Sequence, residues 1–399
     1  MKPPANDSKE RLVALDSLRG MAALSVMFCH LVLVIPGVLI AVNSSHPSSS
    51  SLLNLVTYTP LHIFWLGSES VLFFFVLSGF VLALPFLQTK TPATLSAYFT
   101  KRIFRIYPPY IVAIIIAILA STFFYRGNIP ELSNWFNTQW QAGIDWKLVA
   151  QHFLLIGSFD FTRFDGPIWS LVIEMRISLL FPLIMWLVCR LDWQTSLLTA
   201  LLPSFIYWGL TRLKVHHLFD FQHNYFETLR YVGSFILGGI LAKYRLVLVE
   251  RFRNFDRFRK AMFLILCICA YTNHWWLYAA VMSNHPDWQR LTGNIFFQDI
   301  GVAIGVAGFI ITGLASRSAG GLLASRPLVF LGKISYSLYL YHCICLFSLM
   351  NFFYGRITTN NILVLTILLS LTLAVVGYYL VEVPSMQLGR KLAGIFKKR

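Results

Sequence analysis

The sequence predicts an all-α protein, a polytopic transmembrane helical bundle of about ten spans with both termini in the cytoplasm. Of its 399 residues, 57% are hydrophobic and only 13% are charged, too few charges for the surface of a soluble protein of this length. Apolar runs of roughly 20 residues, the length that crosses a bilayer, recur from one end of the chain to the other. Basic residues cluster between these runs.

Each predicted span is an apolar run bounded by polar or charged residues. The ten predicted spans are 16–40, 61–86, 107–125, 168–189, 195–212, 228–247, 261–282, 296–315, 328–352 and 361–381. Residues 148–161 are also apolar, but they are few and are interrupted by Gln151 and His152. We expect them to form a re-entrant or interfacial segment of a long outer loop, because an eleventh crossing would place the basic segment 243–260 outside.

The distribution of basic residues predicts the orientation of the spans. The net charge is +16, and much of it lies in the segment 243–260 and in the C-terminal GRKLAGIFKKR, whereas residues 41–60 contain no Lys or Arg. Basic loops are retained in the cytoplasm. The charge is therefore interpreted as a topology signal of a protein in a lipid bilayer, with no nucleic acid as partner.

The connections predict a single domain. The N-terminal MKPPANDSKER leads directly into the first apolar run, so no cleavable signal peptide is expected. The loops are short, which predicts one transmembrane domain over residues 1–399 with no appended soluble domain. The six cysteines lie in apolar runs, where cysteine behaves as a small hydrophobe. No Cys/His spacing is typical of zinc, so no metal site is expected.

The first span contains two residues that are unusual in hydrocarbon, Arg19 and His30. Eleven residues make about three helical turns, so both side chains point to one face and lie about 16 Å apart along the axis. Arg19 alone is compatible with an anchor at the membrane interface. His30 alone is compatible with a hydrogen bond between helices. Ionisable residues inside a membrane usually face a cavity or a partner.

The sequence TKRIFRIYPPY places Arg102 and Arg105 three residues apart, on one face of a helix that enters the membrane from the cytoplasm. They are either a positive-inside flank that ends at Pro108 or an anion clamp. Guanidinium groups bind phosphates bidentately and keep their charge when they are partly desolvated. Together with Arg19, these arginines exceed what topology requires and favour the clamp.

The sequence FDGPIWSLVIEMRISLLFPL predicts a helix that begins near Asp165 and Gly166, with proline in its first turn. Glu174 lies inside this span, where a charged side chain costs about 2.5–3.5 kcal/mol on insertion scales. It therefore needs a partner. Two hypotheses are open: an ion pair with Arg176 or another helix, or a pair with His30 in which the carboxylate orients the imidazole.

These segments resemble the acyltransferase-3 family of bacterial membrane enzymes, which transfer acyl groups from acyl-coenzyme A to sugars. The resemblance covers nearly the whole chain and depends on six elements in the same order. They are LDSLRGMAALSVMFCH with Arg19 and His30, FFFVLSGFVL at 73–82, KRIFRIYPPY with Arg102 and Arg105, IWSLVIEMRISLLFPL with Trp169, Ser170 and Glu174, LGKISYSLYLYH with Ser335, Tyr336, Tyr339 and His342, and VEVP at 381–384.

The resemblance implies roles for these residues. Arg19, Arg102 and Arg105 would bind the phosphates of acyl-CoA near the cytoplasmic face. His30 and Glu174 would be catalytic, with His30 either a general base on the acceptor hydroxyl or a nucleophile that forms an acyl-imidazole. Weaker candidates for the cavity wall are Trp169, Ser170, Tyr336, Tyr339 and His342.

The chain also departs from the family pattern. Met175 and Ser178 occupy positions where many members have a second acidic residue and an aromatic residue, so only Glu174 can carry an acidic role there. Tyr341 replaces a frequent tryptophan. Some members have an extracytoplasmic esterase-like domain, and none is expected in this chain. If it passes its acyl group to a second protein, that periplasmic partner is separate.

The expected function is O-acetyl transfer from acetyl-CoA or another acyl-CoA to a glycan or glycolipid, such as a surface polysaccharide or lipopolysaccharide. The enzyme would be an acyltransferase for groups other than aminoacyl groups, in the bacterial inner membrane, with acyl-CoA as substrate and no permanently bound cofactor. Acceptor contacts are expected from the outer loop 126–166, where Trp135, Trp140 and Trp146 either stack on sugars or anchor the loop at the interface.

Two alternative functions stay open from the sequence. One is acylation of a small glycosylated molecule. The other is solute transport, because ten helices with buried charges also suit a transporter. Against transport, the halves of the chain show no internal repeat, and the buried charges gather on the first, third and fourth spans. The oligomeric state is open and includes a homo-oligomer.

Overall fold

A computed structural model describes residues 5–44, 50–87, 94–213, 225–277, 295–315 and 322–396. Within these residues the protein is a helical bundle without a β-strand. Its helices are α1 (Ala5–Leu33), α2 (Pro36–Ser44), α3 (Ser51–Thr57), η1 (Pro60–Trp65), α4 (Ser68–Ala83), α5 (Leu95–Phe124), α6 (Asn134–Asn137), α7 (Trp146–Leu154), η2 (Gly166–Ile168), α8 (Trp169–Arg190), α9 (Trp193–Arg212), α10 (Glu227–Arg253), α11 (Arg257–Tyr271), α12 (Asn273–Leu277), α14 (Ile295–Ala315), η5 (Leu322–Ala324), α15 (Arg326–Phe353), α16 (Thr359–Gly377), η6 (Tyr378–Glu382) and α17 (Val383–Ile395).

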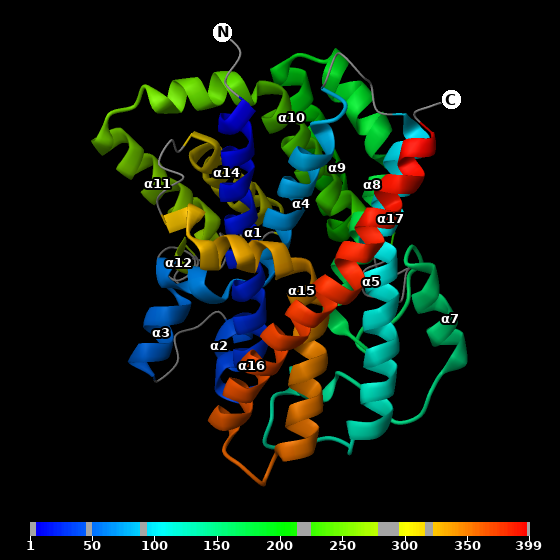
Figure 1. Ribbon diagram of the computed structural model, residues 1–399. Helices are drawn as coiled ribbons and strands as arrows, with labels where there is room; N and C mark the ends of the chain where they lie inside the picture. The colour runs from blue at the N-terminus through cyan, green and yellow to red at the C-terminus, as the bar shows by residue number, and fades with distance from the viewer. Residues whose placement is uncertain are drawn as a thin grey trace.

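The two chain termini lie at the same end of the bundle, at the top of Figure 1, where the basic junction between α10 and α11 also lies. We call this the inner end. The opposite, outer end carries α2, α3 and the connection from α15 to α16. An even number of crossings and a cytoplasmic location of both termini agree with this arrangement.

Seven helical stretches of the described residues are long and apolar enough to cross a membrane, and α4 is a shorter apolar helix. The seven are Val13–Leu33, Leu95–Phe124, Gly166–Arg190, Glu227–Arg253, Phe296–Ala315, Arg326–Phe353 and Thr359–Ile395. The chain is therefore a multi-pass membrane protein. Helices α9 and α11 form where spans are predicted but are not among the seven, and residues 278–282 of one predicted span lie outside the described residues. The count of ten stays a prediction.

Two predicted boundaries are wrong. The first span was expected to reach residue 40, but α1 ends at Leu33 because Pro36 disfavours helix at the residue before it and begins α2. The basic segment 243–260 was expected to be a loop, but α10 continues to Arg253 and α11 begins at Arg257. The side chain of Asp256 caps α11 by accepting a hydrogen bond from the backbone N–H of Arg259 at 2.7 Å.

Helix α5 begins at Leu95, not near residue 107 as predicted, and it continues through Pro108. Proline has no N–H to donate to the carbonyl four residues earlier, which here belongs to Phe104. That carbonyl accepts a hydrogen bond from the Ser385 hydroxyl of α17 instead. The next turn is also held from outside, because the Tyr336 hydroxyl donates to the Ile106 carbonyl at 2.9 Å. Helices α15 and α17 thus stabilise α5 where proline weakens it.

The last predicted span, 361–381, is longer than expected. Helix α16 passes through the π-helical turn η6 into α17, so one helical stretch runs from Thr359 to Ile395. A π turn inserts an extra residue and rotates the side chains that follow it, and such turns are frequent at functional sites. Glu382 at the end of this turn is fully buried.

The apolar interior consists of two clusters, and α1 and α8 contribute to both. Helix α1 provides Val26 to the cluster around α5 and α15 and Leu15 to the cluster around α4 and α10. Helix α8 provides Val172 to the first and Ile173 to the second. The predicted site residues of α1 and α8 therefore lie along the seam between two packed halves.

Two glycines set the distance between α1 and α15. A Cβ atom on Gly20 would lie 2.6 Å from the backbone nitrogen of Gly332, and a Cβ atom on Gly332 would lie 2.1 Å from the carbonyl oxygen of Asp16. Only glycine permits this approach. It brings Arg19, the residue before Gly20, against the backbone of α15.

Residues 148–161 do not form a spanning helix. They contain most of α7, which has nine residues, followed by an irregular segment. The Arg176 guanidinium of α8 donates to the carbonyls of Ile156 at 3.0 Å and Gly157 at 2.6 Å, and to the Thr228 hydroxyl at 3.1 Å. Arg176 thus fixes the outer loop to the bundle, and it does not form the ion pair with Glu174 that the sequence left open.

Candidate active site

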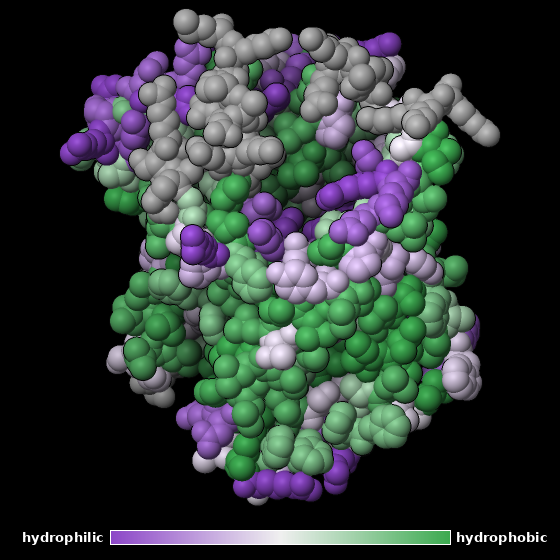
Figure 2. Space-filling view, viewed as in Figure 1, coloured by the Kyte–Doolittle hydropathy of each residue, from purple (hydrophilic) through white to green (hydrophobic). Residues whose placement is uncertain are grey.

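The inner half of the bundle contains a cavity of about 520 Å³ between α1, α4, α5, α8, α15 and α17, which we call the inner cavity. Figure 2 shows a hollow in the upper half of the molecule with hydrophilic side chains along it. The charged residues that line the inner cavity are Arg19, Lys101, Arg102, Arg105, Arg390 and Glu174. The three predicted arginines thus reach one cavity from two helices, and the described residues of its wall include five basic groups and one acidic group.

Arg102 is held by α8. Its Nη2 donates to a carboxylate oxygen of Glu174, and its Nε donates to the Ser178 hydroxyl at 2.8 Å. The same oxygen of Glu174 accepts a hydrogen bond from the Ser78 hydroxyl of α4 at 2.8 Å. Ser178, which stands where many members of the resembling family have an aromatic residue, is therefore part of the arginine's binding site.

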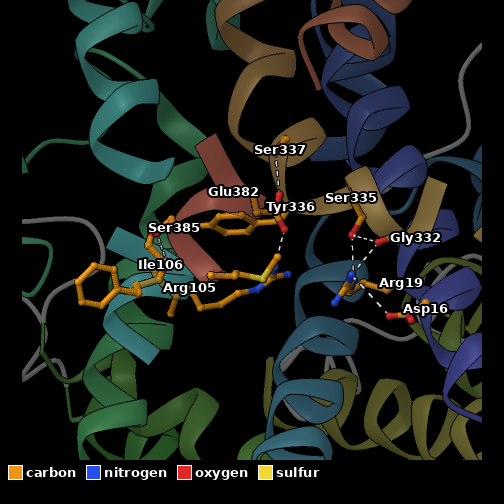
Figure 3. A network of polar contacts seen from close by, with 12 residues as sticks. Asp16, Arg19, Arg105, Ile106, Gly332, Ser335, Tyr336, Ser337, Glu382 and Ser385 are labelled. Carbon is orange, nitrogen blue, oxygen red and sulfur yellow. Dashed lines mark hydrogen bonds and ion pairs between the residues drawn. The ribbon is translucent and has the colours of Figure 1, made fainter. Parts of the chain in front are cut away.

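Arg105 is paired with a carboxylate from the other end of the chain. Its Nη1 donates to Glu382, whose second oxygen accepts a hydrogen bond from the Ser337 hydroxyl at 2.8 Å. The guanidinium also lies over the ring of Tyr336, 5.4 Å from its centroid. Figure 3 shows Glu382 and Tyr336 beside Arg105. Sequence reasoning did not select Glu382, although the closing VEVP element contains it.

Arg19 is bound by α15. Its Nη2 donates to the Gly332 carbonyl at 2.7 Å and its Nε to the Ser335 hydroxyl at 2.9 Å, while Asp16 lies 3.6 Å away. In Figure 3 the side chains of Arg19 and Arg105 extend toward the same space from opposite sides. Arg19 is thus held mainly by neutral acceptors and forms a longer ion pair with one partly exposed carboxylate, Asp16.

Two further basic residues at the inner cavity were not selected from the sequence, Lys101 and Arg390. Both are exposed, and neither forms an ion pair with a carboxylate in the part of the chain that the structure describes. Lys101 directly precedes Arg102, whereas Arg390 lies on α17 far away in sequence. Adjacency to the arginine motif was a signal for Lys101, but no sequence signal identified Arg390.

His30 lies in a second, smaller cavity of about 250 Å³, which we call the outer cavity. Its wall comes from α1, α2, η1, α4, α8, α12 and α15. Val71 and Tyr339 line both cavities. Arg19 and His30 therefore line two different cavities that share part of their walls.

The partner of His30 is His342, with 2.9 Å between His30 Nδ1 and His342 Nε2. His342 Nδ1 lies 2.8 Å from the Tyr339 carbonyl and 3.1 Å from the Leu338 carbonyl. Carbonyls only accept, so Nδ1 of His342 carries a hydrogen and its Nε2 accepts in the neutral pair. His30 Nδ1 then donates, and His30 Nε2 keeps its lone pair. The hydrogen bonds therefore set the tautomer of a base.

The hypothesis that Glu174 orients His30 does not agree with the structure. Glu174 binds Arg102 and Ser78 at the inner cavity, and His30 binds His342 at the outer cavity. The orienting position beside the imidazole is occupied by a second histidine, which the sequence analysis placed only among the weaker cavity residues.

The other weak candidates also lie at the site. Trp169 lines the outer cavity, while Ser170 and Tyr336 line the inner one. The Ser170 and Tyr339 hydroxyls are 2.8 Å apart, and the Tyr339 hydroxyl lies 2.8 Å from the Pro167 carbonyl. These contacts fix Tyr339 where the two cavities adjoin.

The tryptophans of the outer loop have different positions from one another. Trp135 stacks on the His30 ring, with centroids 5.3 Å apart. Trp140 is buried and donates from Nε1 to the Phe164 carbonyl at 2.8 Å. Trp146 is 73% exposed. None of the three lines the outer cavity, so loop 126–166 supports the imidazole rather than forming the cavity wall.

One group of potential metal ligands occurs among the described residues, His30, His342 and Cys343, whose ligand atoms lie within 4.8 Å of one another. The lone pair of His342 Nε2, which a metal would need, accepts the hydrogen bond of His30. Cys343 is fully buried. The donor set therefore fits a hydrogen-bonded imidazole pair better than a metal centre.

Asp165 lies directly before the helical start at Gly166 that the sequence predicted. It is fully buried, and neither carboxyl oxygen has a hydrogen-bond partner within the described residues. Burial raises the pKa of Asp165 well above its usual range.

Comparison with known proteins adds an independent result. Residues 12–381 match the family model described as "Acyltransferase domain". The chain is 25% identical over 340 residues to the O-acetyltransferase OatA of Staphylococcus aureus, covering 82% of this chain and 54% of OatA. It is 23% identical over 346 residues to the putative O-acetyltransferase SACOL0978 of the same species, covering 80% and 52%.

A shorter match has higher identity. The acyltransferase MdmB of Streptomyces mycarofaciens is 30% identical over 178 residues, covering 43% of this chain and 39% of that protein. The chain thus spans about half the length or less of these curated relatives. No solved structure matches it. Because the family model covers more than nine-tenths of the sequence, the chain belongs to the acyltransferase-3 family.

Proposed function

We propose that this protein transfers an acyl group from cytoplasmic acyl-CoA to a hydroxyl group of a glycan, and that the acyl group is acetyl. The observation that carries the proposal is the arrangement of the two cavities. A strongly basic inner cavity adjoins an outer cavity whose wall contains an imidazole with an available lone pair. The names of the relatives OatA and SACOL0978, both O-acetyltransferases, support the same chemistry.

The inner cavity is the donor site in this proposal. CoA carries several phosphates and reaches the membrane from the cytoplasm, so the basic wall at the inner end suits its nucleotide. Arg19, Arg102 and Arg105 bind or orient this part of the donor. Glu174 acts through Arg102, which it holds in place, and not through His30.

The pantetheine arm extends from the inner cavity past Tyr339 toward His30. His30 Nε2 removes the proton of the acceptor hydroxyl while its oxygen attacks the thioester carbonyl. The carbon–sulfur bond then breaks, and the CoA sulfur takes the proton back from the imidazolium. His342 keeps Nε2 of His30 unprotonated before the reaction and stabilises the imidazolium during it, as the orienting residue does in a catalytic triad.

The same geometry supports a second mechanism. His30 Nε2 attacks the thioester carbonyl itself, the carbon–sulfur bond breaks, and CoA leaves as a thiolate. The acceptor hydroxyl then takes the acyl group from the acylated imidazole, and its proton passes to the CoA thiolate. Both mechanisms need the same tautomer. They differ in whether an acylated protein accumulates when the acceptor is withheld.

The proposed location is the bacterial inner membrane, with the inner end in the cytoplasm. The acceptor arrives from the outer side, as a surface polysaccharide, a lipopolysaccharide or a smaller glycosylated molecule. A separate periplasmic protein that receives the acyl group and a homo-oligomeric assembly are both compatible with this arrangement.

The test uses purified protein in lipid nanodiscs. We expect acetyl-CoA to bind with measurable affinity by calorimetry and the His30→Ala variant to bind it equally well. That variant loses acetyl transfer by about 10²- to 10⁴-fold, the usual contribution of a general base. Phe28→Ala is the matched control, because Phe28 lies on the same helix, is 36% exposed and lines neither cavity.

Retained transfer in His30→Ala would remove the imidazole from the reaction. Uptake of an unmodified solute by proteoliposomes without CoA would favour a transporter instead.

A further inference from the structure

We propose that the outer cavity binds the protonated amine of a ligand, through the carboxylate of Glu69 and an aromatic wall. The indoles of this wall belong to Trp65, Trp169 and Trp275. The binding site does not depend on the proposed function, because its evidence comes from the outer cavity alone. One further step does rest on the proposed function: the amine belongs to the acceptor, whose hydroxyl is presented to His30.

Glu69 differs from three other carboxylates of the bundle interior. Glu174, Glu382 and Asp299 each form an ion pair with an arginine. Glu69 is only 5% exposed, yet no Lys or Arg pairs with it in the part of the chain that the structure describes. Buried charges are normally paired, since removing a charge from water is costly. A buried carboxylate that faces a cavity without such a partner therefore indicates a cationic ligand.

The contacts of Glu69 stabilise its ionised form. Trp275 Nε1, which can only donate, lies 2.8 Å from one carboxyl oxygen, and the Ser68 hydroxyl donates to the other at 3.2 Å. Glu69 also lies in the first turn of α4, where the helix dipole favours a negative charge. Each carboxyl oxygen keeps a further lone pair, so the group can accept hydrogen bonds from an ammonium ion as well.

The imidazoles of the wall are hydrogen-bond acceptors too. His62 Nδ1 donates to the Thr57 carbonyl at 2.8 Å, so its Nε2 accepts, and no partner of this atom lies among the described residues. His30 Nε2 is an acceptor for the reason given above. Trp275 contacts both His62 and Glu69, which places these two acceptors in the same part of the wall. A protonated primary amine supplies three N–H donors to such a wall.

The aromatic side chains add a second attraction for a cation. The negative face of an aromatic ring attracts an ammonium group, and tryptophan does so most strongly. The His62 ring lies between Trp65 and Trp275, with 3.9 Å between ring centroids on each side. Trp65 Nε1 also donates to the Val56 carbonyl at 3.2 Å. Because these indoles are already ordered, a ligand loses less free energy in ordering them.

Other ions fit this wall less well. An anion is disfavoured, because none of the described residues that line the outer cavity is Lys or Arg. Mg²⁺ and Ca²⁺ are bound by several oxygen ligands, whereas Glu69 is the only carboxylate among those residues, and indoles offer no lone pair. An amine on a carbon skeleton uses both the carboxylate and the aromatic surface. The volume of about 250 Å³ suits a small amine of one ring.

Under the proposed function, the charge on the ligand also selects the atom that is acylated. A protonated amine has no lone pair and is not a nucleophile, whereas a hydroxyl of the same molecule can give its proton to His30 Nε2. The ester bond forms at this oxygen, the carbon–sulfur bond of acetyl-CoA breaks, and the hydroxyl proton passes through His30 to the CoA sulfur. The amine keeps its proton throughout. Glu69 thus directs the acyl group to oxygen.

The experiment compares two ligands of nearly equal shape, trans-4-aminocyclohexanol and trans-4-methylcyclohexanol, in which a methyl group replaces the ammonium group. Binding to the purified protein is measured by calorimetry without acetyl-CoA. Maltoside detergent and phosphate buffer are used, because many lipids and buffers contain amines. We expect the amine to bind about tenfold or more tightly than the methyl compound. Equal affinity would overturn the proposal, and so would displacement of the amine by an equal concentration of Mg²⁺.

Variants test the residues directly. Glu69→Gln keeps the shape but removes the charge, and we expect it to weaken amine binding about tenfold or more and to leave binding of the methyl compound unchanged. Trp65→Leu should weaken amine binding severalfold through loss of the cation–π contact. Glu131→Gln is the matched control, because Glu131 is exposed and lines neither cavity. Wild-type amine affinity in Glu69→Gln would contradict the proposal. The affinity for acetyl-CoA, which should be equal in all variants, reports on folding.

A second assay adds acetyl-CoA and separates the ammonium site from the proposed function. We expect an acetylated product by mass spectrometry that mild alkali cleaves, as it cleaves an ester and not an amide. An amide product, or binding of the amine without acetylation while acetyl-CoA is hydrolysed, would refute the assignment of the amine to the acceptor. Failure of the wild-type protein to bind or cleave acetyl-CoA would refute the proposed function and leave the ammonium site in place.

Discussion

Replacing His342 tests the tautomer that the structure assigns to His30. In His342→Ala, the Nδ1–H of His30 loses its acceptor at 2.9 Å, so the imidazole is free to rotate and to place its hydrogen on either nitrogen. In His342→Gln, the amide oxygen can accept the same hydrogen bond. We therefore expect kcat to fall strongly in the alanine variant and to recover in part in the glutamine variant.

The size of the effect follows from the contacts. One hydrogen bond contributes about 0.5–1.5 kcal/mol net, so loss of orientation alone lowers kcat about 2- to 13-fold. If the ring settles with its hydrogen on Nε2, the whole contribution of the general base is lost, about 10²- to 10⁴-fold. The KM for acetyl-CoA should stay unchanged, because His342 does not line the inner cavity.

The assay is steady-state CoA release with saturating acceptor, together with the KM for acetyl-CoA. Ser348→Ala on the same helix is the matched control, because its hydroxyl binds only the Ile344 carbonyl of its own helix and it lines neither cavity. Wild-type kcat in His342→Ala would refute the reasoning. So would a glutamine variant as slow as the alanine variant in protein of equal stability.

Three further predictions concern the charges. Lys101→Gln and Arg390→Gln should raise the KM for acetyl-CoA severalfold. The KM for acetyl-pantetheine should stay unchanged, because this donor lacks the nucleotide. Equal effects on the KM values of both donors would show that neither residue contacts the phosphates. Glu382→Gln leaves Arg105 without its carboxylate, and because breaking a buried ion pair costs about 3–5 kcal/mol, a thermal-shift assay should show a clear loss of stability. Burial lowers the pKa of His152 to about 4, so the unfolded chain binds a proton first as the pH falls. About 3 kcal/mol of stability, fully present above pH 6.5, should therefore be lost toward pH 4. Hydrogen exchange in α7, divided at each pH by the intrinsic exchange rate of the unfolded peptide, should show this as a falling protection factor, and a constant protection factor would contradict it.

The sequence predicted well those features that depend on one helix alone, namely where a helix lies and which of its residues share a face. Apolar runs located the long helices, and the helical repeat predicted that Arg102 and Arg105 share a face, where both line the inner cavity. These inferences need only the 3.6-residue repeat and the high free energy of charges in hydrocarbon. The resemblance to a known family then identified the helices whose charged residues belong together.

Contacts between helices were not predictable in the same way. Nothing in the spacing of Glu174 indicates whether it faces Arg102 or His30, since both lie on other helices and both are chemically suitable partners. Pro108 suggested a helix end, but a hydroxyl from α17 satisfies the carbonyl that the proline leaves free. Glu382, which binds Arg105, lies in a π turn, and such a turn has no sequence signature that we used.

The order of charges along α5 gives the donor site a direction under the proposed function. Lys101 and Arg390 have no carboxylate partner among the described residues, whereas Arg102 and Arg105 are each paired with one. Arg105 lies four residues, or about 6 Å, further into the helix than Lys101. Lys101 and Arg390 therefore attract the phosphates at the inner end. Arg102 and Arg105 lie deeper, and because their charges are compensated they stabilise the phosphates less. The nucleotide should therefore bind toward the inner end, between the uncompensated cations and the three arginines, while the uncharged pantetheine arm continues to His30. The carboxylates that pair with Arg102 and Arg105 thus have a role in positioning the donor. If all five cations were unpaired, they would also attract the phosphates deep in the cavity, where the thioester has to lie.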